Sequence, residues 1–249
     1  MGLNTDRLMD LARARGLESG PAPTDLVAAS VTIARRIAAG GTLWCTSPSW
    51  PRQADLAAAK LAQLGSAFED TCRVAAVSDE DLCSAMRALA HSGDAILLVA
   101  SADEGSAARL AQRAKAWGLA TIWIGNGPRP AAGAADYVLW TGGDETMPGD
   151  GGDLTLACAL LVDLTSRCLA DRSALEPEAV VCTEEVCITC SDEGRLGEVV
   201  ALRPGGCAEV RTPSGIEEVD TTLVDSAQPG DLVLIHAGAI VTLVEDSAP

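Results

Sequence analysis

Apolar residues in the first two thirds of the chain recur with two different spacings. Helical spacing, in which an apolar residue returns at every third or fourth position, predicts helices over residues 25–39, 81–91 and 106–117. Continuous apolar runs predict buried strands at residues 42–45, 95–100, 120–125 and 135–140. Because strands that alternate with helices are typical of a parallel sheet with helices on its faces, we expect an α/β layer fold here.

The pattern changes after residue 170. Residues 141–153 are rich in Gly, Asp and Glu and predict an exposed loop, which leads into a helix over 154–170. From Val181 onward helical spacing disappears, and short β-rich runs follow at residues 198–202, 208–211, 217–219, 232–236 and 240–244. Turns that contain Pro and Gly separate these runs, as in a small β-barrel. We therefore predict an α/β domain over 1–180 and an all-β barrel over 181–249.

The charge of the chain restricts its partners. With 18 Lys and Arg against 35 Asp and Glu, the 249 residues carry a formal net charge of -17. Such a chain repels phosphate backbones and anionic lipids, so we expect no nucleic-acid or membrane binding, and a protein partner should be neutral or basic where it docks. The sequence lacks a secretory signal pattern, and no apolar run reaches the roughly 18 residues of a membrane span, so we expect a cytoplasmic protein.

Nine cysteines are many for a chain expected in a reducing compartment, where thiols are more often buried, metal-binding or reactive than paired. Five stand singly in apolar or helical surroundings and should act as small hydrophobic side chains: Cys45, Cys72, Cys83, Cys158 and Cys168. The other four crowd together near the start of the predicted barrel: Cys182, Cys187, Cys190 and Cys207. The spacing of Cys187 and Cys190 brings two soft thiolate ligands toward one metal ion. His236, at the end of a predicted strand, is the other strong ligand type here.

Two other metal sites fit parts of this cysteine cluster. A zinc site normally takes four ligands in two close pairs, and one such pair is present. An iron–sulfur cluster fits the spacing of Cys182, Cys187 and Cys190, which matches the plant-type ferredoxin pattern with Cys207 as the fourth ligand, although the surrounding sequence is not that of a ferredoxin. His236 also has a structural alternative, in which its ring donates a hydrogen bond to a backbone carbonyl.

Four blocks of the C-terminal part agree in order and spacing with a known family. They are VCITCSD at 186–192, GEVV at 197–200, VDTTLV at 219–224 and GDLVLIHAG at 230–238. Over residues 182–249 the chain thus resembles the HypC/HupF hydrogenase maturation chaperones, which implies an OB-like β-barrel. In that family a cysteine transiently holds iron that carries two cyanides and carbon monoxide, Fe(CN)2CO, between a HypD-like scaffold and the precursor of the [NiFe] hydrogenase large subunit. By position, the resemblance assigns the iron to Cys187 and places His236 near it.

Two departures from the family pattern affect this assignment. The family cysteine follows the initiator Met, whereas Cys187 is internal and follows a whole domain. Leu196 replaces the usual proline and residues 191–195 lengthen the approach to Gly197, so Cys190 is a second candidate ligand or a redox partner. The resemblance implies an assembly chaperone rather than an enzyme.

Three blocks of the N-terminal part also resemble a family: LWCTS at 43–47, GDAILLVAS at 93–101 and GLATIWI at 118–124. They resemble the sugar isomerase (SIS) fold, particularly phosphoheptose isomerases, in which Ser- and Thr-rich loops and helix N-termini bind a sugar phosphate. The resemblance makes Thr46, Ser47 and Ser101 candidate ligand-binding residues. Asp103 and Glu104 stand in the second loop, where they would repel an anion. We expect a binding module, or a platform for a homodimer; the alternative is a sugar-phosphate isomerase or sugar-phosphate-binding protein with an accessory β-domain.

Overall fold

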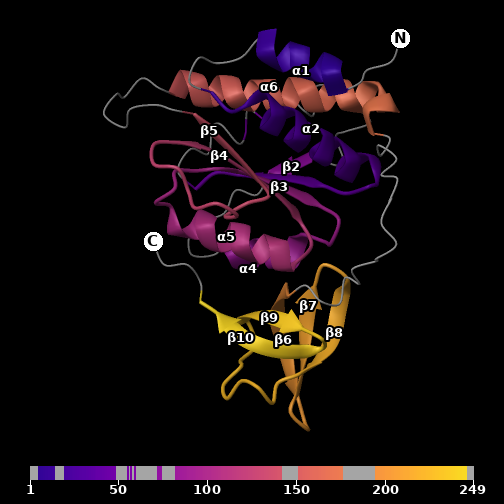
Figure 1. The fold of residues 1–249 in the computed structure, drawn as a ribbon, viewed down its shortest axis with the longest axis vertical. Coiled ribbons are helices and arrows are strands. Elements are labelled where there is room, and N and C mark those ends of the chain that lie inside the picture. The colour runs from indigo at the N-terminus through magenta and orange to yellow at the C-terminus, as the bar shows by residue number, and fades with distance from the viewer. Residues whose placement is uncertain are drawn as a thin grey trace, which may run out of the picture.

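The computed structural model describes residues 5–14, 20–48, 55, 57, 59, 72–74, 82–141, 151–175 and 194–245. These residues form an α/β domain and a small barrel that lies against one helical layer of that domain (Figure 1). The last described element of the α/β domain ends at Leu175, and the first strand of the barrel begins at Arg195. The predicted boundary at residue 180 falls between them, outside the described residues, and stays a prediction.

Five parallel strands form the sheet of the α/β domain, in the order β2-β1-β3-β4-β5. Their bounds are Leu43–Thr46 (β1), Cys72–Val74 (β2), Ala95–Val99 (β3), Ala120–Asn126 (β4) and Tyr137–Thr141 (β5). The central strands are apolar along their length because helices cover both faces; every residue of β3 is buried. Thr46 pairs with Leu98, so the carboxyl ends of β1 and β3 lie at the same edge of the sheet.

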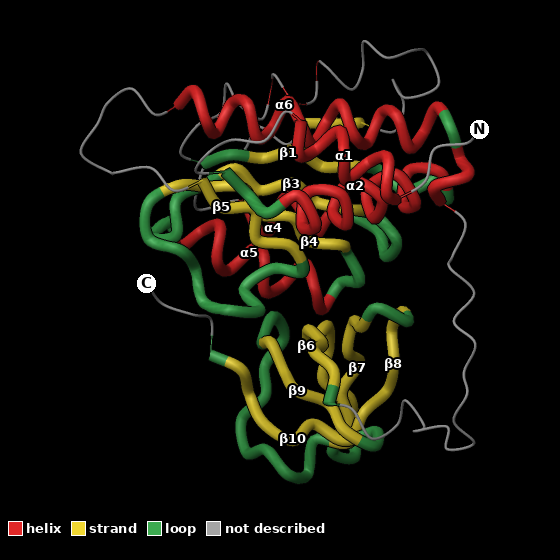
Figure 2. The backbone as a smooth tube through the Cα atoms, turned by 45° about the horizontal axis from the view of Figure 1, so that its top comes forward, coloured by secondary structure: helices red, strands yellow, loops and turns green. Residues whose placement is uncertain are grey.

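Helices on both faces of the sheet complete three layers (Figure 2). Their bounds are Thr5–Ala14 (α1), Pro23–Ala38 (α2), Leu82–Leu89 (α4), Gly105–Ala116 (α5) and Gly151–Ala170 (α6), followed by a short 3-10 helix at Arg172–Leu175. α1, α2 and α6 lie on one face, whereas α4 and α5 lie on the other, between the sheet and the barrel (Figure 1). Within the described ranges, no helix is both long and apolar enough to cross a membrane.

The predicted elements occur within a few residues of their expected bounds, with two differences. α6 begins at Gly151, so the end of the predicted loop is helical; Asp153 lies in the first turn, where the helix dipole favours a carboxylate. α1 and β2 were not predicted. α1 is polar on average, and its few apolar side chains, including Leu8 and Ala12, are buried in the core shared with α2 and α6.

Five strands form the C-terminal barrel, which is closed in the order β10-β8-β7-β6-β9. Their bounds are Arg195–Arg203 (β6), Cys207–Thr212 (β7), Gly215–Asp220 (β8), Leu232–His236 (β9) and Ala239–Val244 (β10). Side chains fill the interior: Val199, Ala208, Val210, Val219, Val233, Ile235 and Ile240. Gly197 is needed in β6 because a Cβ there would lie 2.4 Å from Val210 Cγ1. The predicted fold class, an α/β parallel-sheet domain followed by a small β-barrel, is confirmed.

Candidate functional site

His236 ends β9 beside the turn to β10, and its side chain is exposed. Ala237 and Gly238 form this turn with φ values of 50° and 81°, and His236 pairs with Ala239 across it. A two-residue hairpin turn of this kind takes positive φ at both positions. An alanine in that conformation costs about 1–2 kcal/mol because its Cβ approaches the backbone. The turn therefore holds the imidazole in an accessible place at the expense of local strain.

The start of β6 lies next to this turn. Arg195 pairs with Ile235, the residue before His236, and a Cβ on Gly194 would lie 3.1 Å from Leu234 Cδ1. The predicted metal ligands Cys187 and Cys190 lie outside the described residues and precede Gly194 by seven and four residues. The chain thus enters the barrel from the cysteine segment beside His236. We call residues 194–195, 220 and 236–239, which the register brings together, the His236 end of the barrel.

The strand register brings a carboxylate and a further thiol toward the His236 end. Asp220 of β8 pairs with Ala239 on one side and with Cys207 on the other. Hydrogen bonds from the Thr222 side chain and from its backbone N–H, at 2.6 Å, lower the pKa of Asp220, so this group is a carboxylate at neutral pH. Among the described residues, no three His, Cys, Asp or Glu side chains are grouped so that they could hold a metal ion. Cys182, the other predicted member of the cysteine cluster, lies outside those residues.

The cysteines of the α/β domain are buried or partly buried. Cys45, Cys158 and Cys168 are buried, and Cys83 is partly exposed; the side chain of Cys72 is not described. Burial raises the pKa of the Cys168 thiol to about 11. A thiol with this pKa is almost fully protonated near neutral pH and is a poor nucleophile and metal ligand. This agrees with the prediction that these cysteines act as small hydrophobic side chains.

The three candidate sugar-phosphate residues lie at one edge of the sheet. Thr46 ends β1 and is buried, Ser47 follows it, and Ser101 lies just beyond β3. Each serine donates its hydroxyl to an acceptor within the protein: Ser47 to the Val99 carbonyl and Ser101 to the Asp103 carboxylate, both at 2.5 Å.

The next loop residues extend this pattern. Ser106 Oγ donates to Glu104 Oε1 at 3.1 Å, in the first turn of α5. The carboxylates of Asp103 and Glu104 thus accept the hydrogen bonds that these serine hydroxyls would otherwise donate to a bound phosphate. The structure brings the predicted residues to one edge, but it surrounds them with negative charge that disfavours an anion.

A buried charge that the sequence patterns did not reveal lies where the two domains meet. Glu198 of β6 is buried, and its carboxylate accepts hydrogen bonds from Arg87, Arg113 and Trp117 of the α/β domain. In the sequence, Glu198 stands between Gly197 and Val199 like any surface residue of an alternating strand. Its donors lie 81 to 111 residues away along the chain, so no local pattern could pair them with it.

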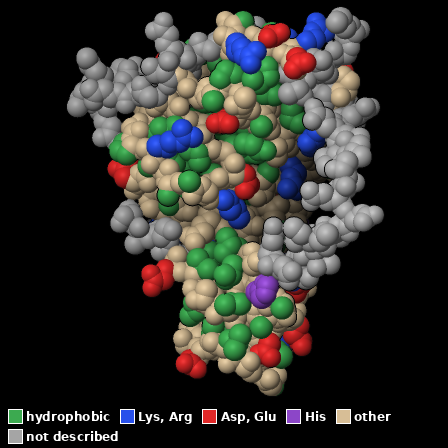
Figure 3. All heavy atoms as spheres, in the orientation of Figure 1, with side chains coloured by type: hydrophobic (Ala, Val, Ile, Leu, Met, Phe, Trp, Pro, Cys, Tyr) green, Lys and Arg blue, Asp and Glu red, His purple; other side chains and the backbone are tan. Residues whose placement is uncertain are grey.

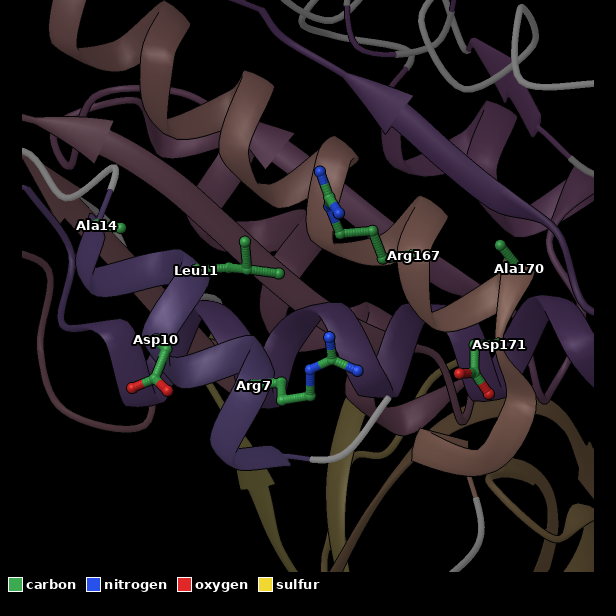
Figure 4. Close-up of a pocket in the computed structure, with 7 residues that line it drawn as sticks. All are labelled: Arg7, Asp10, Leu11, Ala14, Arg167, Ala170 and Asp171. Carbon is green, nitrogen blue, oxygen red and sulfur yellow. The ribbon is translucent and has the colours of Figure 1, made fainter. Parts of the chain in front are cut away.

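Two cavities are lined mainly by residues of the α/β domain. One, of about 580 Å³, lies between α1 and the end of α6 and is lined by Arg7, Asp10, Arg167 and Asp171 among others (Figure 4). Its two arginines and two aspartates balance in charge, so it favours neither anions nor cations. The other, of about 410 Å³, runs along α5 and the loop 130–134, and Leu196 of the barrel lines it as well.

Comparison with solved structures gives similarities to phosphosugar isomerases. A protein from Listeria monocytogenes assigned as a sugar-phosphate isomerase is 19% identical over 66% of this chain and 84% of its own, with a TM-score of 0.47. A protein from Bacteroides fragilis assigned as a phosphosugar isomerase involved in capsule formation is 17% identical over 67% of this chain and 86% of its own, with a TM-score of 0.49. A phosphoheptose isomerase from Francisella tularensis is 12% identical over 65% and 94%, with a TM-score of 0.46.

No family model and no curated protein matches the chain. Because the identities to the solved structures are below 20% and the TM-scores below 0.5, ligand and activity have to be argued from the side chains of this chain itself.

Proposed function

We propose that this protein is a non-catalytic metal carrier of the HypC/HupF type, whose barrel holds iron through Cys187 with His236 nearby. The barrel transiently carries Fe(CN)2CO between a HypD-like scaffold protein and the large-subunit precursor of a [NiFe] hydrogenase. These partners come from the sequence resemblance of residues 182–249.

The supporting observation is the position of β6 beside the end of β9. Arg195 lies five residues after Cys190 and pairs with Ile235, the residue before His236. A strained turn holds that histidine in the open. A thiolate and an imidazole together suit iron or another borderline metal, whereas either alone is a weak site, so the proposal requires Cys187 to reach His236 across the residues before Gly194.

The α/β domain supports a role without catalysis. The candidate hydroxyls of Ser47 and Ser101 are engaged by acceptors of the protein itself, and two carboxylates occupy the loop where a phosphate would bind. His91, the other histidine of the chain, follows α4 at the amino end of β3, away from Ser47 and Ser101. His91 is therefore not placed to act as a general base for a substrate bound beside Ser47 and Ser101.

The test is infrared spectroscopy of the full chain, purified without oxygen from cells that assemble a hydrogenase. Cyanide and carbonyl stretching bands should be present with the unaltered protein and lost with Cys187→Ser. Cys83→Ser, at a partly exposed cysteine of the α/β domain, is the control and should keep the bands. Bands that persist in Cys187→Ser but vanish in Cys190→Ser would move the ligand to Cys190, and bands that survive both substitutions would refute the proposal.

A second candidate function, sugar-phosphate binding by the α/β domain, is favoured by one observation. Thr46, Ser47 and Ser101 lie at the carboxyl ends of the adjacent strands β1 and β3, where α/β sheets commonly bind ligands. A melting assay of the full chain with sedoheptulose 7-phosphate tests it, since a ligand of the folded state raises Tm. A rise in the Tm of the unaltered protein would support this function. A rise only in the variant Asp103→Ser/Glu104→Gly would show that the acidic loop prevents binding, and this outcome, like a rise in neither protein, would exclude the function for the unaltered chain.

A further inference from the structure

Glu198 connects the two domains through a buried carboxylate. Its side chain is 2% exposed and comes from β6, whereas its donors come from the helical layer beneath the barrel. Arg87 of α4 donates through Nε to both carboxylate oxygens at 3.1 Å and also through Nη2. Arg113 of α5 donates from Nη1 at 2.9 Å, and Trp117, just after α5, donates from Nε1 at 2.8 Å. Both oxygens of the carboxylate are therefore occupied by donors of the other domain.

Apolar packing surrounds this carboxylate. Leu232, the first residue of β9, is buried in the same core as the inner side chains of α4 and α5, and Leu196 and Val244 pack against that core. Leu232 also pairs with Glu198 in the sheet. The contact between the domains thus combines apolar packing with one ionic group, whose carboxylate is buried and whose Arg87 side chain is 43% exposed.

A second contact lies at the β7–β8 turn. Ser92 Oγ donates to the Pro213 carbonyl at 2.6 Å, and a Cβ on Gly118 would lie 2.9 Å from Pro213 Cα. Arg113 also donates to the Gly230 carbonyl, at 2.7 Å, before β9. Three separate segments of the barrel therefore touch the α/β domain, which resists both sliding and rotation. We call this set of contacts the junction.

The ionic group makes the junction selective for one orientation. A buried carboxylate without partners is strongly unfavourable, and removal of one member of a buried ion pair leaves an uncompensated charge. Because arginine donates in a planar fork and Trp117 from one fixed direction, a small rotation of the barrel would lose several of these bonds at once. Apolar contacts alone would tolerate such a shift more readily.

We infer that Arg87, Arg113 and Trp117 form a carboxylate-recognition surface that fixes the barrel in one orientation, so that the two domains act as a single rigid body. The junction forms without metal ligands. It restricts where a partner can bind, because the face of the barrel around Glu198 and Leu232 is already covered by the chain itself. A partner that binds the barrel must use the barrel surface that α4 and α5 leave uncovered, and at the edge of that surface it would also contact the α/β domain.

That remaining surface has a defined chemistry. Six of the large hydrophobic side chains exposed on the described residues belong to the barrel: Val200, Leu202, Ile216, Leu223, Val241 and Leu243. Figure 3 shows hydrophobic side chains on the face of the barrel turned to the viewer, with a histidine among them and acidic side chains around them. Apart from Glu198, which the junction buries, residues 194–245 contain seven Asp and Glu against three Arg. A partner of the rigid body should therefore offer apolar side chains within a basic rim.

Measurement of ¹⁵N relaxation on the full chain tests the rigid body directly. In the unaltered protein, amides of β7 and of β4 should report the same rotational correlation time. In Glu198→Ala the barrel should be released and tumble separately, with its correlation time shortened about twofold or more, because it makes up a small part of the mass. Dispersed barrel resonances in the same spectra establish that the barrel is still folded.

The matched control is Glu209→Ala, which removes an ion pair with Arg203 on the exposed surface of the same barrel and should leave one common correlation time. If Glu198→Ala unfolds the barrel, Arg113→Ala approaches the junction from the other domain and should release the barrel in the same way. Separate correlation times in the unaltered protein, or one common time in both junction variants, would overturn the inference.

Discussion

The two ends of β9 have opposite surroundings. Its first residue, Leu232, is buried against α4 and α5 beside Glu198, whose charge is paired on all sides. Its last residue, His236, is exposed next to an alanine held at positive φ. Lasting contacts bury apolar surface and satisfy every polar group within it, whereas a group that binds and releases a ligand has to remain accessible. The five residues of β9 thus connect a buried contact between the two domains with a solvent-exposed histidine.

The largest effect on this contrast should come from Glu198→Ala. The substitution leaves two arginines and an indole N–H without their shared acceptor, so the free energy of unfolding should fall by about 3–5 kcal/mol. Chemical denaturation of the full chain measures it. Glu209→Ala, at an exposed pair, should cost less than about 1 kcal/mol. Similar losses in the two variants would show that the junction is not held by its carboxylate.

A smaller loss of stability is expected from Gly197→Ala. Gly197 lies in β6 opposite Val233 of β9, between the junction and the His236 end. The new Cβ would lie 2.4 Å from Val210 Cγ1 and 2.8 Å from Ile235 Cδ1, so overpacking should cost about 1–3 kcal/mol. Thermal unfolding followed by circular dichroism would show a lower Tm. Val200→Ala, an exposed position on the same strand, should change stability by less than about 0.5 kcal/mol. An unchanged Tm for Gly197→Ala would show that the Val210 and Ile235 side chains can move aside at little cost in free energy, and that the barrel interior is not tightly packed there.

The smallest effect should come from the His236 end itself. Ala237→Gly relieves about 1–2 kcal/mol of strain at positive φ. It also adds the conformational entropy of a glycine to the unfolded chain, which costs about 0.5–1 kcal/mol, so a net gain of up to about 1.5 kcal/mol is expected. Ala239→Gly, in the strand that follows, should instead lower stability. A loss of stability in Ala237→Gly would show that the turn is relaxed and that the exposed histidine is not held at the cost of strain.

Local patterns predicted the elements well where burial is uniform. The all-apolar runs that became β3 and β4 can only lie between two helical layers, and the short runs divided by Pro-Gly turns became the barrel strands. α1 was missed because its composition is polar and only tertiary packing against α2 and α6 makes it a helix of the core.

The candidate site was predictable in its residue types and not in its arrangement. His236 was identified as a ligand type from its chemistry, but its exposure and its place beside the start of β6 follow from the strand register, which a sequence does not state. Trp117 is buried in the core, and its role as a donor to Glu198 depends on a contact across 81 residues of chain.

Closure of the barrel limits how other chains can attach to it. Every strand from β6 to β10 has a neighbour on each side, whereas β2 and β5 end the sheet of the α/β domain. Unpaired strand edges invite strand addition and fibre growth, and closure removes most of them; β10 and β8 meet at the single pair Ala239–Asp220. The other strands of the barrel can therefore display exposed apolar side chains with less aggregation hazard than the same side chains would bring on an open sheet, and recognition on those strands has to proceed through side chains.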